Sequence, residues 1–172
     1  MMYFLKSLKN GQLAIILFDF FIGGFTGWIY ETVITSIYLH RFEDRGVLPI
    51  PILPIYGLFA IAVVPLFKNE KSPFFIGAVG AILATVFELI AAFFTEYVCG
   101  YRLWTYEHWP LNFFGGRISV FSSIVFGILC VLFVKVLHPL GVSLYKRFQN
   151  RFSISVLIIA LMLFVCCFIP VK

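Results

Sequence analysis

Charged residues are scarce in this chain of 172 residues, where Lys, Arg, Asp and Glu together make up 12%. An ordinary soluble domain contains roughly 25% charged residues and covers its surface with them. This chain is instead 62% hydrophobic, with 22 Phe among its aromatic residues. The low charge excludes a soluble globular protein, and the high hydrophobicity excludes a disordered chain. The composition therefore predicts an all-α polytopic membrane protein.

The sequence also lacks the motifs of common cofactor and catalytic sites. It has no G-x-x-x-x-G-K-[ST] phosphate-binding loop, so any ATPase that drives this protein would be on another chain. The four cysteines form no C-x-x-C pair, and the three histidines make no zinc-like cluster with them. The net charge of +5 comes from cations set singly or in pairs between apolar runs. We therefore expect no metal, no cofactor and no nucleic-acid partner.

Five apolar runs stand out along the chain, at about 12–39, 51–67, 73–98, 117–138 and 152–169. At roughly 20 residues per spanning helix, they predict about five transmembrane helices in a single transmembrane domain over residues 1–172. Most cations fall in segments that would share one side, which predicts a cytoplasmic N-terminus by the positive-inside rule. The cations of that side are Lys6, Lys9, Lys68, Lys71, Lys135, Lys146, Arg147 and Arg151, against Arg41, Arg45, Arg102, Arg117 and Lys172 on the other.

Acidic residues occur inside the apolar runs, where an ionised side chain costs at least about 2.5 kcal/mol. Glu31 and Glu88 come late in outward-running helices, so we expect both in the outer half of the bilayer. The cations nearest to them on that side are Arg45, Arg102 and Arg117, and a guanidinium group can hydrogen-bond a carboxylate twice. We therefore predict a Glu/Arg network near the outer face. The intramembrane acids are Asp19, Glu31, Glu88 and Glu96.

This network has three interpretations that the sequence leaves open. It is a structural clasp that ties loops to helices, a site for a solute or an ion, or a site of acid–base catalysis. No nucleophile–base pair stands beside the acids, so we assign no catalytic residue. The candidate substrate-binding or structural residues are Glu31, Arg45, Tyr56, Glu88, Glu96, Arg102, Trp104, Tyr106 and Arg117.

Two loops adjoin these candidates. Residues 45–57 contain three prolines, which favour an extended entry to a helix and make the segment either the lining of a site or a rigid loop. Residues 101–109 are aromatic and partly charged, so they form either an interfacial belt or a lid over the network. Small residues at helical spacing in the first, third and fourth runs indicate close helix packing.

A parallel internal repeat is a further hypothesis, in which helix pair 1–2 corresponds to helix pair 3–4. Glu31 precedes Arg45 by fourteen residues, and Glu88 precedes Arg102 by the same number. Each arginine is then followed by a glycine at the entry to the next helix. The match is short, so a chance coincidence stays open as the alternative.

Several motifs carry a resemblance to a known family, and they occur in order between about residues 20 and 140. They are Gly27-Trp28-Ile29-Tyr30-Glu31, Arg45-Gly46, Pro54-Ile55-Tyr56-Gly57, Phe87-Glu88, Glu96, Trp104 with Tyr106, Gly116-Arg117-Ile118 and His138-Pro139. With them the chain resembles a bacterial family of small integral membrane proteins named "putative ABC-transporter type IV". The chain departs from the family pattern at Ile50 and Thr105, where glycine and aspartate are favoured.

The resemblance implies a multi-pass protein of the cell membrane with a role in transport. We expect a permease-like membrane subunit of a transporter, with the lipid bilayer as its surroundings and a separate ATPase subunit as the partner if ATP is used. Two alternatives stay open: a membrane-embedded enzyme that acts on a lipid-linked substrate, and a membrane interaction or assembly protein. The sequence leaves the substrate and the oligomeric state undetermined.

Overall fold

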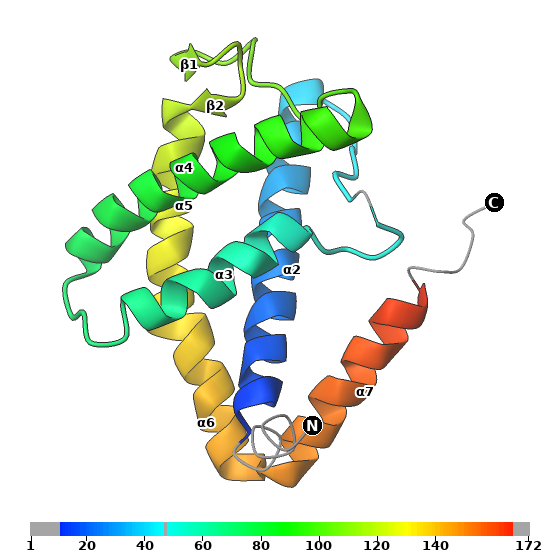
Figure 1. Ribbon diagram of the computed structural model, residues 1–172, viewed down its shortest axis with the longest axis vertical. Helices are drawn as coiled ribbons and strands as arrows, with labels where there is room; N and C mark the ends of the chain where they lie inside the picture. The colour runs from blue at the N-terminus through cyan, green and yellow to red at the C-terminus, as the bar shows by residue number, and fades with distance from the viewer. Residues whose placement is uncertain (1–10, 47, 167–172) are drawn as a thin grey trace. The chain divides into compact units, whose positions relative to one another are not determined.

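The computed structural model describes residues 11–46 and 48–166 of the chain. Within this part the chain forms five helices and one short hairpin, which confirms the prediction of an all-helical fold (Figure 1). Three of the cations used to predict the orientation lie outside the described residues: Lys6, Lys9 and Lys172. The end of the fifth apolar run also lies outside them. The helices are α2 (Gln12–Leu39), α3 (Pro54–Leu66), α4 (Pro73–Cys99), a continuous helix made of α5 (Val120–Leu132), the π-helix η1 (Phe133–Leu137) and α6 (His138–Phe148), and α7 (Asn150–Cys166). The hairpin pairs β1 (Asn112–Phe113) with β2 (Ile118–Ser119) in antiparallel fashion.

Three of these helices are long and apolar enough to cross a membrane: Gln12–Leu39, Pro73–Cys99 and Val120–Phe148, with 28, 27 and 29 residues. The helices α3 and α7 are apolar but shorter, with 13 and 17 residues. The number of about five spans, the single transmembrane domain and the parallel repeat therefore stay predictions.

The ends of the long helices follow from local chemistry. Ser72 caps α4 by accepting a hydrogen bond from the Phe75 backbone N–H, and Pro73 follows it at a position where no N–H is needed. Gly100 ends α4 with a φ of 74°, a conformation that glycine adopts without strain. The fourth predicted run ended at 138, whereas the helix continues to Phe148. The π-turn of η1 ends two residues before Pro139, whose ring would conflict with the carbonyl of Lys135, four residues earlier, in a regular α-helix.

The described residues fall into two compact units, and each is described by itself. The first unit comprises the described parts of Met1–Ala62 and Leu137–Lys172. In it α2 packs against α6 and α7, and small residues let the backbones approach. A Cβ on Gly141 would lie 2.5 Å from the Phe18 ring, and one on Gly27 would collide with the ring of Tyr56.

The second unit is Val63–Val136, in which α4 and α5 cross and pack closely. A Cβ on Gly127 would lie 2.6 Å from the Gly77 carbonyl oxygen, and one on Gly80 would lie 2.5 Å from Cys130 Sγ. The predicted small-residue stripes of the third and fourth runs therefore do serve helix packing. The Thr85 hydroxyl adds a hydrogen bond of 2.7 Å to Ser123 Oγ across the same contact.

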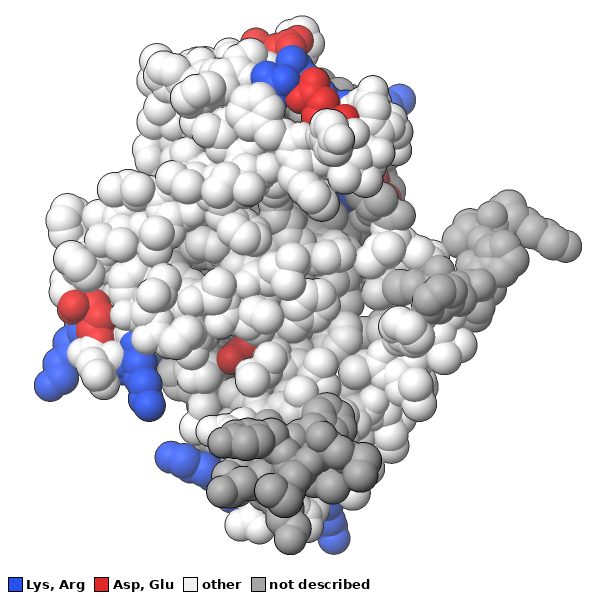
Figure 2. Space-filling model, in the orientation of Figure 1, with Lys and Arg blue, Asp and Glu red and all other residues white. Residues whose placement is uncertain are grey.

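The exposed surface of α4 in this unit is apolar along most of the helix (Figure 2). In Figure 2 the surface over α4 is uncharged between the loop that precedes Pro73 and the loop that follows Cys99. The side chains that α4 exposes there include Ile82, Val86, Ile90 and Phe94. This exposed apolar surface is what a lipid-facing helix requires.

Candidate functional site

Glu31 in the first unit joins the helix α2 to the helix α3. Tyr56 donates a hydrogen bond of 2.7 Å from its hydroxyl to Glu31 Oε1. Arg45 Nε lies 3.9 Å from Glu31 Oε2, and the Arg45 backbone N–H donates to the Thr32 hydroxyl. We call Glu31, Arg45 and Tyr56 the first acid cluster. The structure thus brings together three of the predicted candidate residues.

The first acid cluster depends on the close seating of the proline-rich segment against α2. Gly27, one turn before Glu31, leaves the space that the Tyr56 ring occupies. The Leu53 backbone N–H donates to the Gly24 carbonyl at 3.1 Å, and Ile52 and Leu53 are buried. The irregular backbone directly before Pro54 is therefore covered by α2.

The loop that carries Arg45 is held by Asp44, which the sequence analysis did not single out. Asp44 Oδ1 accepts hydrogen bonds from Trp28 Nε1 at 2.7 Å and from the Gly46 backbone N–H at 2.8 Å. The bond from Gly46, followed by the one from Trp28, holds the pKa of the Asp44 carboxyl below its ordinary value. The aspartate two residues before a glycine is a local turn signal that could have indicated this arrangement.

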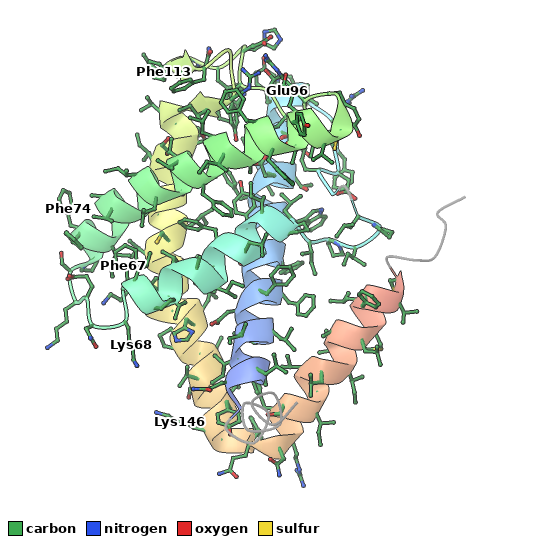
Figure 3. All side chains as sticks on the ribbon, in the orientation of Figure 1. Phe67, Lys68, Phe74, Glu96, Phe113 and Lys146 are labelled. Atoms are coloured by element: carbon green, nitrogen blue, oxygen red, sulfur yellow. The ribbon has the colours of Figure 1, made fainter. Side chains whose placement is uncertain are left out.

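Glu96 lies near the end of α4 (Figure 3). It joins two arginines of the following loop in the second unit. Arg117 donates from Nε and Nη2 to Glu96 Oε2 at 3.0 and 2.6 Å, and Arg102 Nε lies 3.4 Å from Oε1. Arg102 Nη1 also donates to Glu107 Oε1 at 2.8 Å. The two guanidinium charges are therefore matched by two carboxylates.

Glu88 lies two turns before Glu96 on the same helix and is 6% exposed. Its Oε1 accepts a hydrogen bond of 2.8 Å from the hydroxyl of Tyr106, which is equally buried. Tyr106 is held in turn by its backbone N–H, which donates to the Gly116 carbonyl at 2.7 Å. We call Glu88, Glu96, Arg102, Tyr106 and Arg117 the second acid cluster.

The equal offset of fourteen residues does not by itself predict the pairing of these groups. Arg45 lies beside Glu31, as the offset suggests, but the carboxylates that Arg102 contacts are those of Glu96 and Glu107. The predicted Trp104 takes a supporting place, since its Nε1 donates to the Arg117 carbonyl at 3.2 Å. Every predicted candidate residue therefore belongs to, or supports, one of two acid clusters, one in each unit.

The clusters offer carboxylates, guanidinium groups and phenol hydroxyls, which suit a polar or ionic solute. Within residues 11–46 and 48–166, no three His, Cys, Asp or Glu side chains gather in a way that could hold a metal ion. Sequence reasoning missed one further polar pair, Asp19 with His138, whose side chains meet at 2.8 Å. Both residues were noted separately, and only the fold of the first unit places them together.

No curated protein and no solved structure matches the chain significantly. The family described as "putative ABC-transporter type IV" matches residues 18–170, which is most of the chain. The match extends past both ends of the segment in which the motifs were recognised from the sequence. The chain belongs to this family.

Proposed function

We propose that this chain is the membrane subunit of a transporter, with an ATPase on another chain. In this proposal the chain crosses the cell membrane several times and its N-terminus is cytoplasmic. The family description and the three long apolar helices support this assignment. These two findings indicate a membrane location and a relation to ABC transporters.

The single observation that carries a transport site is the burial of Glu88. An acid that is 6% exposed within a helix of 27 residues is costly to keep in an apolar segment without a function. Glu88 lies eleven residues before Cys99, or about 16 Å along the helix, and Glu31 lies about 12 Å before the end of α2. Given the proposed orientation, both acid clusters belong to the outer half of the bilayer.

In the proposed mechanism the loop that carries Tyr106 covers Glu88 in the resting protein. A polar solute or ion that replaces the Tyr106 hydroxyl at the carboxylate would open this cover. Arg102 and Arg117 are joined to Glu96 and to backbone carbonyls, so they hold the loop in place. The bond between Tyr106 and Glu88 and the bonds that hold Arg102 and Arg117 lie within the second unit.

The proposed ATPase partner is tested by purifying the tagged chain from its native membrane. We expect an ATP-hydrolysing chain at a fixed ratio, with a hydrolysis rate that changes when this chain is present. Purification without any nucleotide-hydrolysing partner would contradict the ABC assignment.

The proposed site is tested by complementation of a strain that lacks this chain. Glu88→Gln keeps the size and the hydrogen-bond acceptor of the side chain but removes its charge, so we expect loss of complementation. Glu43→Gln is the matched control, because Glu43 pairs with Arg41 in an exposed loop. Equal complementation by both variants, at equal membrane levels, would rule out Glu88 as the site.

A specific observation also favours a second role for the Glu/Arg groups. Arg102 and Arg117 each donate to a backbone carbonyl, those of Gly115 and Phe114, in addition to Glu96. Such bonds are typical of a structural clasp, as a membrane interaction or assembly protein would need. If the role is structural, Arg117→Ala should lower the stability of the protein. Glu88→Gln, if it folds stably, should then show no transport defect.

A further inference from the structure

Asp19 and His138 form a polar pair in the first unit, apart from the residues of both acid clusters. Asp19 Oδ2 and His138 Nδ1 are 2.8 Å apart, and they come from α2 and from the first residue of α6. The Asp19 side chain is 4% exposed and the His138 side chain is 25% exposed. We call these two residues the Asp19–His138 pair.

The packing of α2 against α6 holds the Asp19–His138 pair in place. His138, Gly141 and Tyr145 are three and seven residues apart, so they share one face of α6. Gly141 receives the ring of Phe18, the neighbour of Asp19, and the Tyr145 ring lies against Gly11. These two contacts lie on one side of the pair, toward the start of α2 and the end of α6, and they hold the two helices close together there.

The charge of the pair depends on a single proton. An ionised carboxylate only accepts hydrogen bonds, so Nδ1 of a neutral His138 carries its hydrogen toward Asp19. The pair then bears one net negative charge in apolar surroundings. Asp19 Oδ1 is buried and has no hydrogen-bond partner among the described residues, so this charge is incompletely compensated.

Among the described residues, no Lys or Arg forms an ion pair with Asp19. The helix α3 carries no charged residue, and Lys135 of the π-turn donates to the Glu70 carbonyl at 2.7 Å. Lys146 and Arg147 lie in the last turn of α6, eight and nine residues after His138. On α7 the charged group is Arg151, which is exposed. Other titratable groups of these elements are Glu31, Tyr30, Tyr38, Tyr56, Tyr145 and Cys166, and Lys6 and Lys9 lie outside the described residues.

We propose that the Asp19–His138 pair is a proton-binding site within the membrane-spanning part of the protein. A hydronium ion transfers its proton to the lone pair of Nε2: an O–H bond breaks, an N–H bond forms and a water molecule is left, so the net charge of the pair changes from minus one to zero. The partial exposure of His138 gives the proton a route, and the burial of Asp19 favours the neutral state. This site is separate from the proposed transport site and does not depend on it.

The position of the pair sets the side from which the proton comes. Asp19 is seven residues after the start of α2, or about 10 Å along the helix, and His138 is about 15 Å before the end of α6. In the sequence, Lys6 and Lys9 precede α2, and Lys146 and Arg147 lie in the last turn of α6. These are cations of the predicted cytoplasmic side. The proton therefore exchanges with the cytoplasm if the predicted orientation is correct.

The composition of the chain permits a direct test by nuclear magnetic resonance. Asp19 and Asp44 are the only aspartates of the sequence, and His138 is one of three histidines. Carboxyl-labelled Asp and ring-labelled His can be followed in the full chain in lipid nanodiscs. Asp44, His40 and His108 lie in loops or at a helix end and provide internal references. His138→Gln assigns the His138 signals.

We expect the His138 ring and the Asp19 carboxyl to respond together in one common transition, because the two groups share one proton site. Asp19→Asn removes the negative charge and keeps the side-chain shape, so it should lower the proton affinity of His138 at least tenfold. An unchanged His138 titration in Asp19→Asn would overturn the proposal. If this variant fails to fold, the wild-type protein decides, because separate responses of Asp19 and His138 would also overturn it.

Discussion

At the scale of single residues, each acid cluster is built on a carboxylate that accepts a hydrogen bond from a tyrosine hydroxyl. The pairs are Glu31 with Tyr56 and Glu88 with Tyr106, at 2.7 and 2.8 Å. Sequence reasoning placed arginines against both acids, because opposite charges attract over the longest range. The hydrogen bond from Tyr106 to Glu88 was not part of that reasoning, because it depends on the fold of the loop, in which the Tyr106 backbone N–H donates to the Gly116 carbonyl.

The hydroxyl of Tyr106 gives the first prediction. Tyr106→Phe leaves the ring in place but removes a donor to a buried carboxylate, so it should lower the free energy of unfolding by about 1–3 kcal/mol. Thermal unfolding in detergent measures the change. Tyr101→Phe is the control, since Tyr101 is 62% exposed. Equal unfolding temperatures for both variants would show that the hydrogen bond to Glu88 contributes no stability.

The carboxyl of Asp44 gives the second prediction, which concerns pH. Its pKa is lowered in the folded loop, so the ionised group stabilises the loop at neutral pH, and this contribution is lost as the pH falls below the ordinary value of 3.8. Trp28→Phe removes one donor and should raise the pKa of Asp44. The labelled Asp signals measure this shift. An Asp44 titration that is the same in both proteins would contradict the role of Trp28.

At the scale of helices, glycines decide how closely α4 and α5 approach. Gly127→Ala would push a Cβ against the Gly77 backbone carbonyl, which cannot move alone, so we expect destabilisation of about 1–3 kcal/mol. Gly77→Ala is the matched control, because its Cβ would lie 3.4 Å from the flexible side chain of Val131. Urea or thermal unfolding compares the two variants. Greater destabilisation by Gly77→Ala would contradict the described contact.

The helices themselves could be predicted from sequence more fully than the contacts between their polar groups. Apolar length and local caps, such as Ser72 with Pro73, define α2 and α4 almost to the residue. The end of the third long helix was predicted too early, because a proline such as Pro139 usually breaks a helix. Here a π-turn accommodates the proline, and the helix continues. The Asp19–His138 pair joins residues 119 positions apart, and no periodicity within one helix indicates such a contact.

At the scale of the whole molecule, the orientation in the membrane remains to be measured. Cys99 is a free and exposed cysteine at the end of α4, on the side predicted to face outward. In a variant with Cys99 as its only cysteine, we expect a membrane-impermeant thiol reagent to label intact cells. Lys71→Cys, introduced without other cysteines, should react only after the membrane is opened. Labelling of Lys71→Cys but not of Cys99 in intact cells would show that the topology is the opposite of the proposed one.

The π-turn of η1 has a consequence for how the sequence can change. A π-turn contains one residue more than an α-turn, so everything after it is rotated by about 100° around the helix axis. Residues of α5 and residues of α6 therefore follow two different angular phases along one continuous helix. Loss of a single residue between Phe133 and Leu137 would give the helix one regular angular phase through this segment. A change of length in η1 therefore alters the direction of every side chain beyond it, which a substitution does not do.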